Sequence, residues 1–357
     1  MKHGKVIVGL SGGVDSAVAA LRLQQAGWQV EGLFMKNWEE DDEDGYCAAA
    51  ADLAEAEAVA GHLGIPLHRV NFATEYWDRV FADFLAEYRA GRTPNPDVLC
   101  NREIKFKAFL DHALDLGADF IATGHYAGVD CSGSDCRLLR AADENKDQTY
   151  FLYQLDQHAL RHALFPLADL RKDAVRHLAQ AAGLPNHARR DSTGICFIGE
   201  RRFRDFLARY LPAQPGEIRT PEGELLGHHA GLMYYTLGQR SGLGIGGVAG
   251  GGDAPWYVVA KDPAANLLLV AQGHDHPLLY RDRLESRQLY WVSGHRPAQG
   301  LRCKARCRHR QPLQDCTLEF TADTLSVHFD RAQRALTPGQ SVVLYDDRDC
   351  LGGGIIE

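Results

Sequence analysis

The sequence predicts an α/β protein that begins with a doubly wound parallel sheet and continues as mostly β-structure. Three observations support this prediction. Apolar, strand-like runs alternate with segments of helical period up to about residue 200, a pattern typical of parallel sheets with helices on both faces. Helix signals almost vanish after Pro212, where short strand-like runs are separated by Gly, Pro, Asp and Asn. The length of 357 residues exceeds what one ordinary core organises, so several domains are expected.

We expect three domains, each with its own composition. They are an α/β domain at residues 1–211, a small, mostly β central domain at residues 212–275, and a C-terminal β-barrel at residues 276–357. In the first domain, apolar runs bounded by turn residues predict strands at 6–10, 30–35, 67–72 and 119–123. Helical spacing of apolar residues predicts helices at about 15–25, 48–63, 97–116, 170–182 and 202–211.

Ser11-Gly12-Gly13-Val14-Asp15-Ser16 directly follows the first predicted strand and opens the first predicted helix. Gly12 and Gly13 carry no Cβ, so the backbone can approach a polyphosphate, and N–H groups at the helix start point toward it. A Walker loop would place Gly-Lys-Ser/Thr after the second glycine, and that lysine is missing here. The loop instead resembles the PP-loop, the pyrophosphate loop of ATP pyrophosphatases, which split ATP between its α- and β-phosphates. The alternative is an ordinary glycine turn before a helix.

Composition and charge exclude several classes of protein. Hydrophobic residues make up 45% and charged residues 24%, which is typical of a soluble globular protein. We find no N-terminal signal pattern and no apolar run near the ~20 residues of a membrane span. The net charge of −8 argues against a generally basic nucleic-acid coat protein, although it permits a local basic face. The nine cysteines lack Cys-x-x-Cys and zinc-finger spacing, which predicts a reducing cytoplasm, mostly inert thiols and no structural metal.

Two cysteines stand in surroundings that can activate a thiol. Cys100 follows Asn95-Pro96-Asp97, and a helix starting at Pro96 or Asp97 would place it in or near the first turn, where N–H groups lower a thiol pKa. Cys196 lies in a glycine-bounded loop after two arginines. A buried small hydrophobe at Cys100 and a packed loop thiol at Cys196 are the alternatives. Beside an ATP-splitting loop, two such thiols suggest adenylation of a carbonyl-type oxygen followed by replacement with sulfur.

Two charged segments could bind a partner or an ion. Arg302, Lys304, Arg306, Arg308 and Arg310 alternate with smaller residues, so a strand at 301–309 would place five cations on one face and favour contact with a phosphate backbone. An ordinary charged edge strand is the alternative. The acidic run at 39–44 is by default a solvated loop, and it could also help to hold Mg²⁺. The segment Lys146-Asp147-Gln148 could bind RNA or cap the following residues.

Taken together in chain order, these segments resemble the bacterial tRNA-specific 2-thiouridylases over essentially the whole chain. The resemblance rests on Gly9–Ser16, Phe34–Trp38, Gly91–Asn101, Gly124–Tyr126, Lys146–Gln148, Asp191–Gly199, Gly231–Gly246 and Leu351–Glu357. It implies a PP-loop domain of the adenine nucleotide alpha hydrolase-like fold. The implied reaction is ATP-dependent 2-thiolation of the wobble uridine in tRNAs for Lys, Glu and Gln, with AMP and pyrophosphate as products. ATP would act as a substrate, together with Mg²⁺.

The same resemblance assigns roles to individual residues. Cys100 would be the catalytic nucleophile, and Cys196 would carry a persulfide supplied by a sulfur-relay protein. The target base would meet Asn95, Pro96 and Asp97. ATP would be bound by Gly9, Leu10, Ser11, Gly12, Gly13, Val14, Asp15, Ser16, Met35 and Gly124. Contacts with tRNA would come from His125, Lys146, Asp147, Gln148, Arg308, His309 and Gln340.

Two other functions remain open at this point. Another PP-loop enzyme, such as an amide- or argininosuccinate-forming ligase, would use the ATP loop without needing the cysteine pair. A non-catalytic RNA-binding or nucleotide-sensing protein would bind ATP without releasing pyrophosphate.

Overall fold

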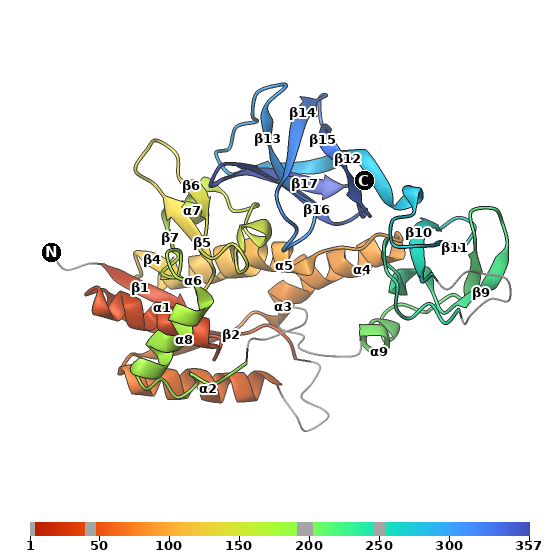
Figure 1. The fold of residues 1–357 in the computed structure, drawn as a ribbon. Helices are drawn as coiled ribbons and strands as arrows, with labels where there is room; N and C mark the ends of the chain where they lie inside the picture. The colour runs from red at the N-terminus through yellow and green to blue at the C-terminus, as the bar shows by residue number, and fades with distance from the viewer. Residues whose placement is uncertain (1–3, 40–47, 191–202, 246–253) are drawn as a thin grey trace.

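The computed structural model describes residues 4–39, 48–190, 203–245 and 254–357 (Figure 1). The α/β domain is built on a five-stranded sheet whose registered pairings are all parallel, as the alternating pattern predicts. The strand order is β3 (Leu67–Asn71), β2 (Gln29–Lys36), β1 (Lys5–Gly9), β4 (Phe120–Ala122) and β7 (Ala163–Leu164).

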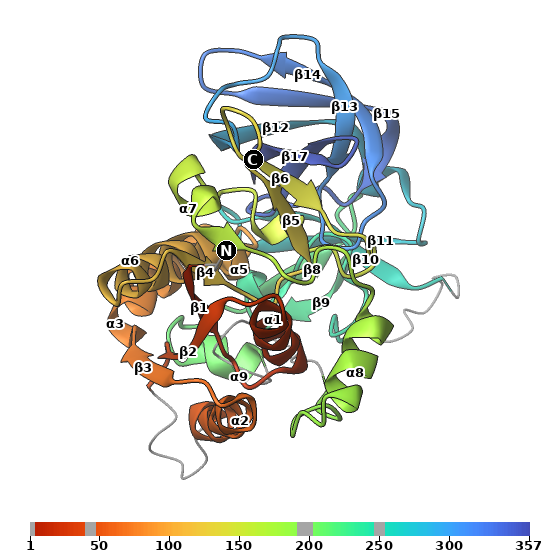
Figure 2. The ribbon, with the colours of Figure 1, turned by 90° about the vertical axis from the view of Figure 1, so that its left-hand side faces the viewer.

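Helices cover both faces of this sheet. Successive side chains of each strand point to opposite faces, so alternate residues of β1 pack against different helical layers. Val6 and Val8 of β1 pack with α1 (Val14–Gln25), α2 (Ala48–Leu63) and α8 (Lys172–Ala181). Ile7 packs with the other helical layer, which completes the doubly wound arrangement seen in Figure 2. That layer consists of α3 (Ala73–Tyr76), η1 (Trp77–Phe81), α4 (Ala82–Arg89), α5 (Pro96–Leu99), η2 (Cys100–Ala108) and α6 (Phe109–Asp115).

The remaining short helices lie in the segments between these elements and between the domains. They are η3 (Thr149–Phe151), α7 (Gln157–Arg161), α9 (Phe203–Ala208), η4 (Leu232–Tyr234) and η5 (Pro277–Leu279). The central unit is a four-stranded sheet around Ile218, Val258 and Leu268. Its strand order is β10 (Trp256–Asp262), β11 (Leu267–Gln272), β8 (Gly216–Arg219) and β9 (Leu225–His229).

The C-terminal strands form a closed barrel, because β12 pairs with β15 on one side and with β17 on the other. Its interior contains apolar residues from successive strands, including Ala305, Leu318, Val327 and Leu344. The strands are β12 (Tyr280–Trp291), β13 (Arg302–Arg306), β14 (Gln314–Phe320), β15 (Leu325–Arg334), β16 (Ser341–Asp346) and β17 (Asp349–Ile356).

A hairpin from the α/β domain extends this barrel, which the sequence analysis did not predict. The hairpin consists of β5 (Ala127–Asp130) and β6 (Arg137–Arg140), and β6 pairs with β17. Its turn contains a Cys131–Cys136 disulfide, whereas we expected a reducing compartment and mostly inert thiols. The physical reason is local, since the turn returns the chain on itself and leaves the two Cα atoms 4.1 Å apart.

The structure contradicts the expected one-sided face of five cations at residues 302–310. β13 ends at Arg306, so Arg308 and Arg310 do not continue its alternation. The face is also neutralised across the sheet, because Arg302 pairs with Asp330 and Lys304 pairs with Asp315. The sequence pattern missed these partners because they come from neighbouring strands.

Arg306 joins the barrel to the α/β domain through a buried ion pair. Its Nη1 lies 3.1 Å from Oδ2 of Asp147, and both side chains are almost fully buried. Asp147 also accepts hydrogen bonds from the hydroxyl of Thr149 and the backbone N–H of Ala141. The charge of Asp147 therefore depends on Arg306 for compensation across the domain boundary.

We expect Arg306→Met to destabilise the protein by about 3–5 kcal/mol, because it leaves the buried Asp147 carboxylate without its counter-charge. Urea unfolding of the full chain measures this loss. Lys304→Met is the matched control on the same strand, and loss of its exposed pair should cost roughly 1 kcal/mol or less. Equal effects of the two substitutions would contradict this account.

Candidate functional site

The turn between β1 and α1, residues 10–13, lies at the carboxyl edge of the sheet and is called the cradle below. Gly12 has φ +75°, a left-handed conformation that favours glycine. A Cβ there would lie 2.6 Å from the backbone oxygen of Asp52. Gly13 is the N-cap of α1 and makes no side-chain capping bond. The first N–H groups of a helix have no partner within the helix, so this end is suited to an anion.

Ser16 fixes the shape of the turn from within. Its hydroxyl donates to the backbone oxygen of Gly13 at 3.0 Å and accepts from the backbone N–H of Ser11 at 3.3 Å. The predicted segment Gly9–Ser16 therefore runs from the end of β1 through a compact turn at residues 10–13 into the first turn of α1.

Gly124 and Met35 lie at this turn, as their positions at strand ends predict. A Cβ at Gly124 would lie 2.6 Å from the backbone nitrogen of Ser16, so the backbone after β4 touches the first turn of α1. The Cε of Met35 lies 3.5 Å from the position of a Cβ at Gly9. The ends of β1, β2 and β4 thus meet at one place, where open α/β sheets bind their ligands.

The cradle does have a lysine nearby, which the sequence analysis missed. Nζ of Lys172, the first residue of α8, lies 2.8 Å from each carboxylate oxygen of Asp15. The hydroxyl of Tyr126 donates to the same carboxylate at 2.9 Å. A Walker-type lysine would lie within the loop itself, whereas Lys172 lies 157 positions after Asp15 in the chain. Only the packing of α8 against α1 reveals it.

Asn95, Pro96 and Asp97 start the helix that carries Cys100. Asn95 caps it by accepting a hydrogen bond from the N–H of Asp97 at 3.2 Å, and Pro96 occupies the first helical position. Cys100 lies just after the first turn and is fully buried in the core. Cys196 and most of the acidic run at 39–44 lie outside the described residues.

All three domains hold the loop before this helix. Nε2 of Gln340, from the barrel, donates to the backbone oxygen of Thr93 at 2.7 Å, and the N–H of Thr93 donates to the backbone oxygen of Pro338 at 2.9 Å. Nζ of Lys261, from β10, donates to the backbone oxygen of Gly91 at 3.2 Å, and burial lowers its pKa to about 8. Gln340, expected to contact tRNA, thus has partners inside the protein.

Other expected tRNA contacts near Gly124 are also engaged internally. His125 is buried with its Nδ1 2.7 Å from the hydroxyl of Thr123, and burial lowers its pKa well below the usual value. The N–H of Tyr126 donates to the side-chain oxygen of Gln148 at 2.9 Å. Asp147 is buried as described above, whereas Lys146 is partly exposed.

The two barrel residues expected to contact tRNA follow the same pattern. Arg308 donates to the backbone oxygens of Leu237 and Ala335, and Nε2 of His309 lies 3.2 Å from the backbone oxygen of Asp147. These hydrogen bonds place both side chains at the junction between domains.

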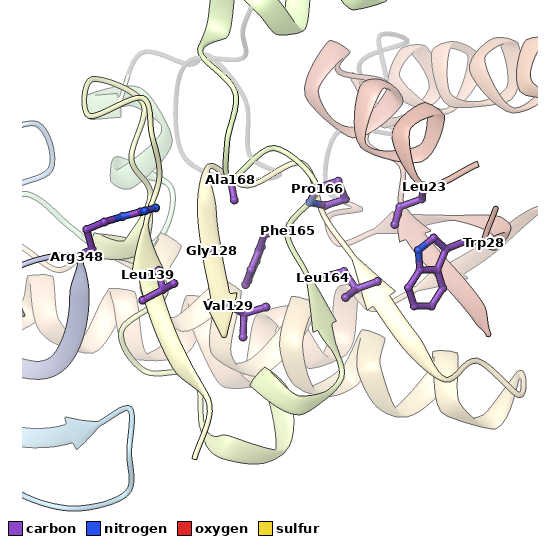
Figure 3. Close-up of a pocket in the computed structure, with 10 residues that line it drawn as sticks. All are labelled: Leu23, Trp28, Gly128, Val129, Leu139, Leu164, Phe165, Pro166, Ala168 and Arg348. Carbon is purple, nitrogen blue, oxygen red and sulfur yellow. The ribbon is translucent and has the colours of Figure 1, made fainter. Parts of the chain in front are cut away.

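A separate cavity of about 350 Å³ lies away from the cradle (Figure 3). It is mostly apolar, and none of the residues expected at the site lines it. The lining residues are Leu23, Trp28, Gly128, Val129, Leu139, Leu164, Phe165, Pro166, Ala168 and Arg348.

Over the parts of the chain that the structure describes, no three His, Cys, Asp or Glu side chains are arranged to hold a metal ion. Among the described helices, none has the length and apolar character to cross a membrane.

Comparisons with known proteins match the chain along its length. Three family profiles match consecutive segments: "tRNA methyl transferase HUP domain" at residues 4–200, "tRNA methyl transferase PRC-barrel domain" at 204–272, and "Aminomethyltransferase beta-barrel domain" at 281–356. The tRNA-specific 2-thiouridylase MnmA of Methylococcus capsulatus is 64% identical over 355 residues, covering 99% of this chain and 96% of the relative. The protein of the same name from Alcanivorax borkumensis is 61% identical, covering 99% and 97%.

The contact between Gly124 and α1 generates a test of the cradle. We expect Gly124→Ala to weaken ATP binding roughly tenfold or more, about 1.4 kcal/mol, because the added methyl group displaces the first turn of α1. Equilibrium titration with ATP measures this change. Gly61→Ala is the control, since a Cβ at this helical position meets nothing within 4 Å. Unchanged ATP affinity in the Gly124 variant would contradict the proposed role of the contact.

Proposed function

The chain belongs to the tRNA-specific 2-thiouridylase family, and from this premise we propose that it is an ATP-dependent tRNA-uridine 2-sulfurtransferase. The proposed reaction replaces the C2 oxygen of the wobble uridine in tRNAs for Lys, Glu and Gln with sulfur. The proposed partners are tRNA and a sulfur-relay protein, and the proposed compartment is the cytoplasm.

The observation that carries this proposal is the position of a buried thiol relative to the phosphate cradle. Cys100 begins η2, which continues directly into α6. Phe109, the first residue of α6, lies 3.3 Å from the position of a Cβ at Gly9. Nine helical residues span on the order of 10 Å. A single continuous helix thus connects the thiol to the end of β1, the strand that leads into the turn that would bind ATP.

The cradle supports adenylation. A uridine flipped out of its stack can present its C2 oxygen to the α-phosphate, and pyrophosphate leaves as the oxygen–phosphorus bond forms. The N–H groups at the start of α1 and the ammonium group of Lys172 would stabilise the departing charge. Asp15 is an acidic group at the cradle, and Mg²⁺ in phosphate sites takes one or two carboxylates together with phosphate oxygens. Both carboxylate oxygens of Asp15 already pair with Lys172, so Mg²⁺ would enter with ATP, held mainly by phosphate oxygens, and would take Asp15 only in exchange for that pairing.

Cys196 would carry the sulfur as a persulfide, and Cys100 would cleave that sulfur from Cys196. In one route, the terminal sulfur of a Cys196 persulfide attacks C2 and AMP leaves with the original oxygen. The Cys100 thiolate then attacks the Cys196 sulfur, which releases the thiolated base and leaves a Cys100–Cys196 disulfide. In the other route, Cys100 attacks the persulfide first, and the released sulfide displaces AMP. Both routes require a thiol reductant to restore the two thiols.

The matched family profiles are described in terms of methyl transfer, but the site favours ATP. The usual methyl donor of such enzymes, S-adenosylmethionine, contains no phosphate. A left-handed glycine followed by a helix start without a side-chain cap is an arrangement that suits phosphate oxygens. This local geometry supports the thiolation proposal over methyl transfer.

Lys172 provides a test of the phosphate site that does not depend on sulfur chemistry. We expect Lys172→Met to weaken binding of inorganic pyrophosphate roughly tenfold, because a charge-assisted contact to phosphate is lost. Arg171→Met is the matched control, since this neighbouring arginine is exposed. Isothermal titration measures the pyrophosphate affinity of both variants. Equal affinities would contradict the assignment of Lys172 to the phosphate site.

The decisive experiment separates adenylation from sulfur transfer. Purified protein is incubated with ATP, unmodified tRNA and a persulfide donor. Pyrophosphate release, AMP release and the mass of the digested nucleosides are then measured. We expect Cys100→Ala and Cys196→Ala to abolish the thiolated nucleoside and AMP release, while tRNA-dependent pyrophosphate release, which reports adenylation alone, persists for one turnover. Cys316→Ala, in the barrel core, is the control and should retain product.

The other outcomes identify the rival functions. Intact ATP and unmodified tRNA with the wild-type protein would indicate a nucleotide sensor. AMP release with no thiolated nucleoside in any variant, including the wild type, would indicate a different adenylating enzyme.

A further inference from the structure

We propose that Asn186 and Arg189 are positioning residues that orient the Gly12–Gly13 peptide for the phosphates of ATP. The inference deepens the proposed function and rests on it, because it concerns the same nucleotide site. Both residues lie just after α8, in a turn that the sequence analysis did not connect with the site.

Both side chains donate to the same backbone carbonyl. Nδ2 of Asn186 lies 2.8 Å from the backbone oxygen of Gly12, and Nη1 of Arg189 lies 3.1 Å from it. Asn186 is 174 positions away in sequence, so the contact is purely tertiary. A carbonyl oxygen has two acceptor sites, and these two donors can occupy both.

Fixing this carbonyl also fixes the next N–H. In a planar trans peptide, the C=O of one residue and the N–H of the next point in opposite directions. With the Gly12 oxygen held toward Asn186 and Arg189, the N–H of Gly13 must point away from them. Glycines on both sides of this peptide would otherwise let it rotate readily. The two donors therefore select one of the orientations that the glycines allow.

The surroundings of the two donors restrict their movement. Arg189 is ion-paired with Asp52, and its backbone oxygen accepts a hydrogen bond from Nη1 of Arg176 at 3.1 Å. Asn186 is 3% exposed, and its Oδ1 has no hydrogen-bond partner among the residues described. An unsatisfied buried acceptor costs about 1–3 kcal/mol, so a purely structural role poorly explains an asparagine here. The hydrogen bond that its side chain makes within the described residues is the one from Nδ2 to the backbone oxygen of Gly12.

The test compares ligands that carry phosphates with one that does not. Asn186→Asp keeps the size of the side chain but replaces the donor with a carboxylate facing the Gly12 oxygen. We expect it to weaken binding of ATP and of inorganic pyrophosphate by roughly tenfold or more, while adenosine binding stays within about twofold of wild type. Gln180→Glu makes the same amide-to-carboxylate change on the exposed face of α8 and should bind all three ligands normally.

Arg189 provides an independent second arm. Arg189→Met should weaken ATP and pyrophosphate binding, and Arg189→Lys, which retains a donor and the charge, should restore part of the loss. Equal losses for adenosine and ATP in both Asn186→Asp and Arg189→Met would indicate general damage and overturn the proposal. Wild-type affinity in both variants would also overturn it.

The same titrations distinguish this inference from the proposed function. If wild-type protein binds neither ATP nor pyrophosphate, the result contradicts the proposed function itself. If wild-type protein binds both and the two variants bind them equally well, only the positioning role fails.

Discussion

The position of the barrel on the α/β domain depends on the buried carboxylate of Asp147. It collects hydrogen bonds from Thr149 and Ala141 within the α/β domain and an ion pair from Arg306 of the barrel. A buried charge is tolerated only with such compensation, so this contact constrains where the barrel can sit. That placement lets Gln340 and Pro338 reach the loop before α5. Through this loop, the barrel takes part in shaping the site.

The phosphate cradle gathers positive charge from distant parts of the chain. The overall charge is −8, yet Lys172 and Arg189 both lie at the first turn of α1, which adds the positive end of a helix dipole. Asp15 and Asp52 pair with these two cations and limit their repulsion. The two cations and the two carboxylates cancel in formal charge, so the proposed anion site depends on the N–H groups at the start of α1 and on where each charge lies.

The sequence predicted features that local chemistry determines. The glycine turn, the start of the helix at Pro96, and the meeting of Gly9, Met35 and Gly124 at one sheet edge all follow from short-range patterns and from sheet topology. Lys172 could not be recognised in this way, because its role comes from the packing of α8 on α1. The same limit explains the error at residues 302–310, where the alternation ends with β13 at Arg306 and the neutralising aspartates lie on other strands. The pairing of Asp147 likewise depends on Arg306 of the barrel, and His125 is buried by distant residues of its own domain, Phe106 and Phe165.

The hairpin β5–β6 has a consequence for the order of events during synthesis. Arg137 and Asp349, which face each other across this junction, are 212 positions apart in sequence. A ribosome therefore releases the hairpin long before its partner strand β17 exists, and an open strand edge is a template for intermolecular pairing. Because β17 both closes the barrel and covers that edge, the nascent chain stays vulnerable to aggregation until β17 has been translated.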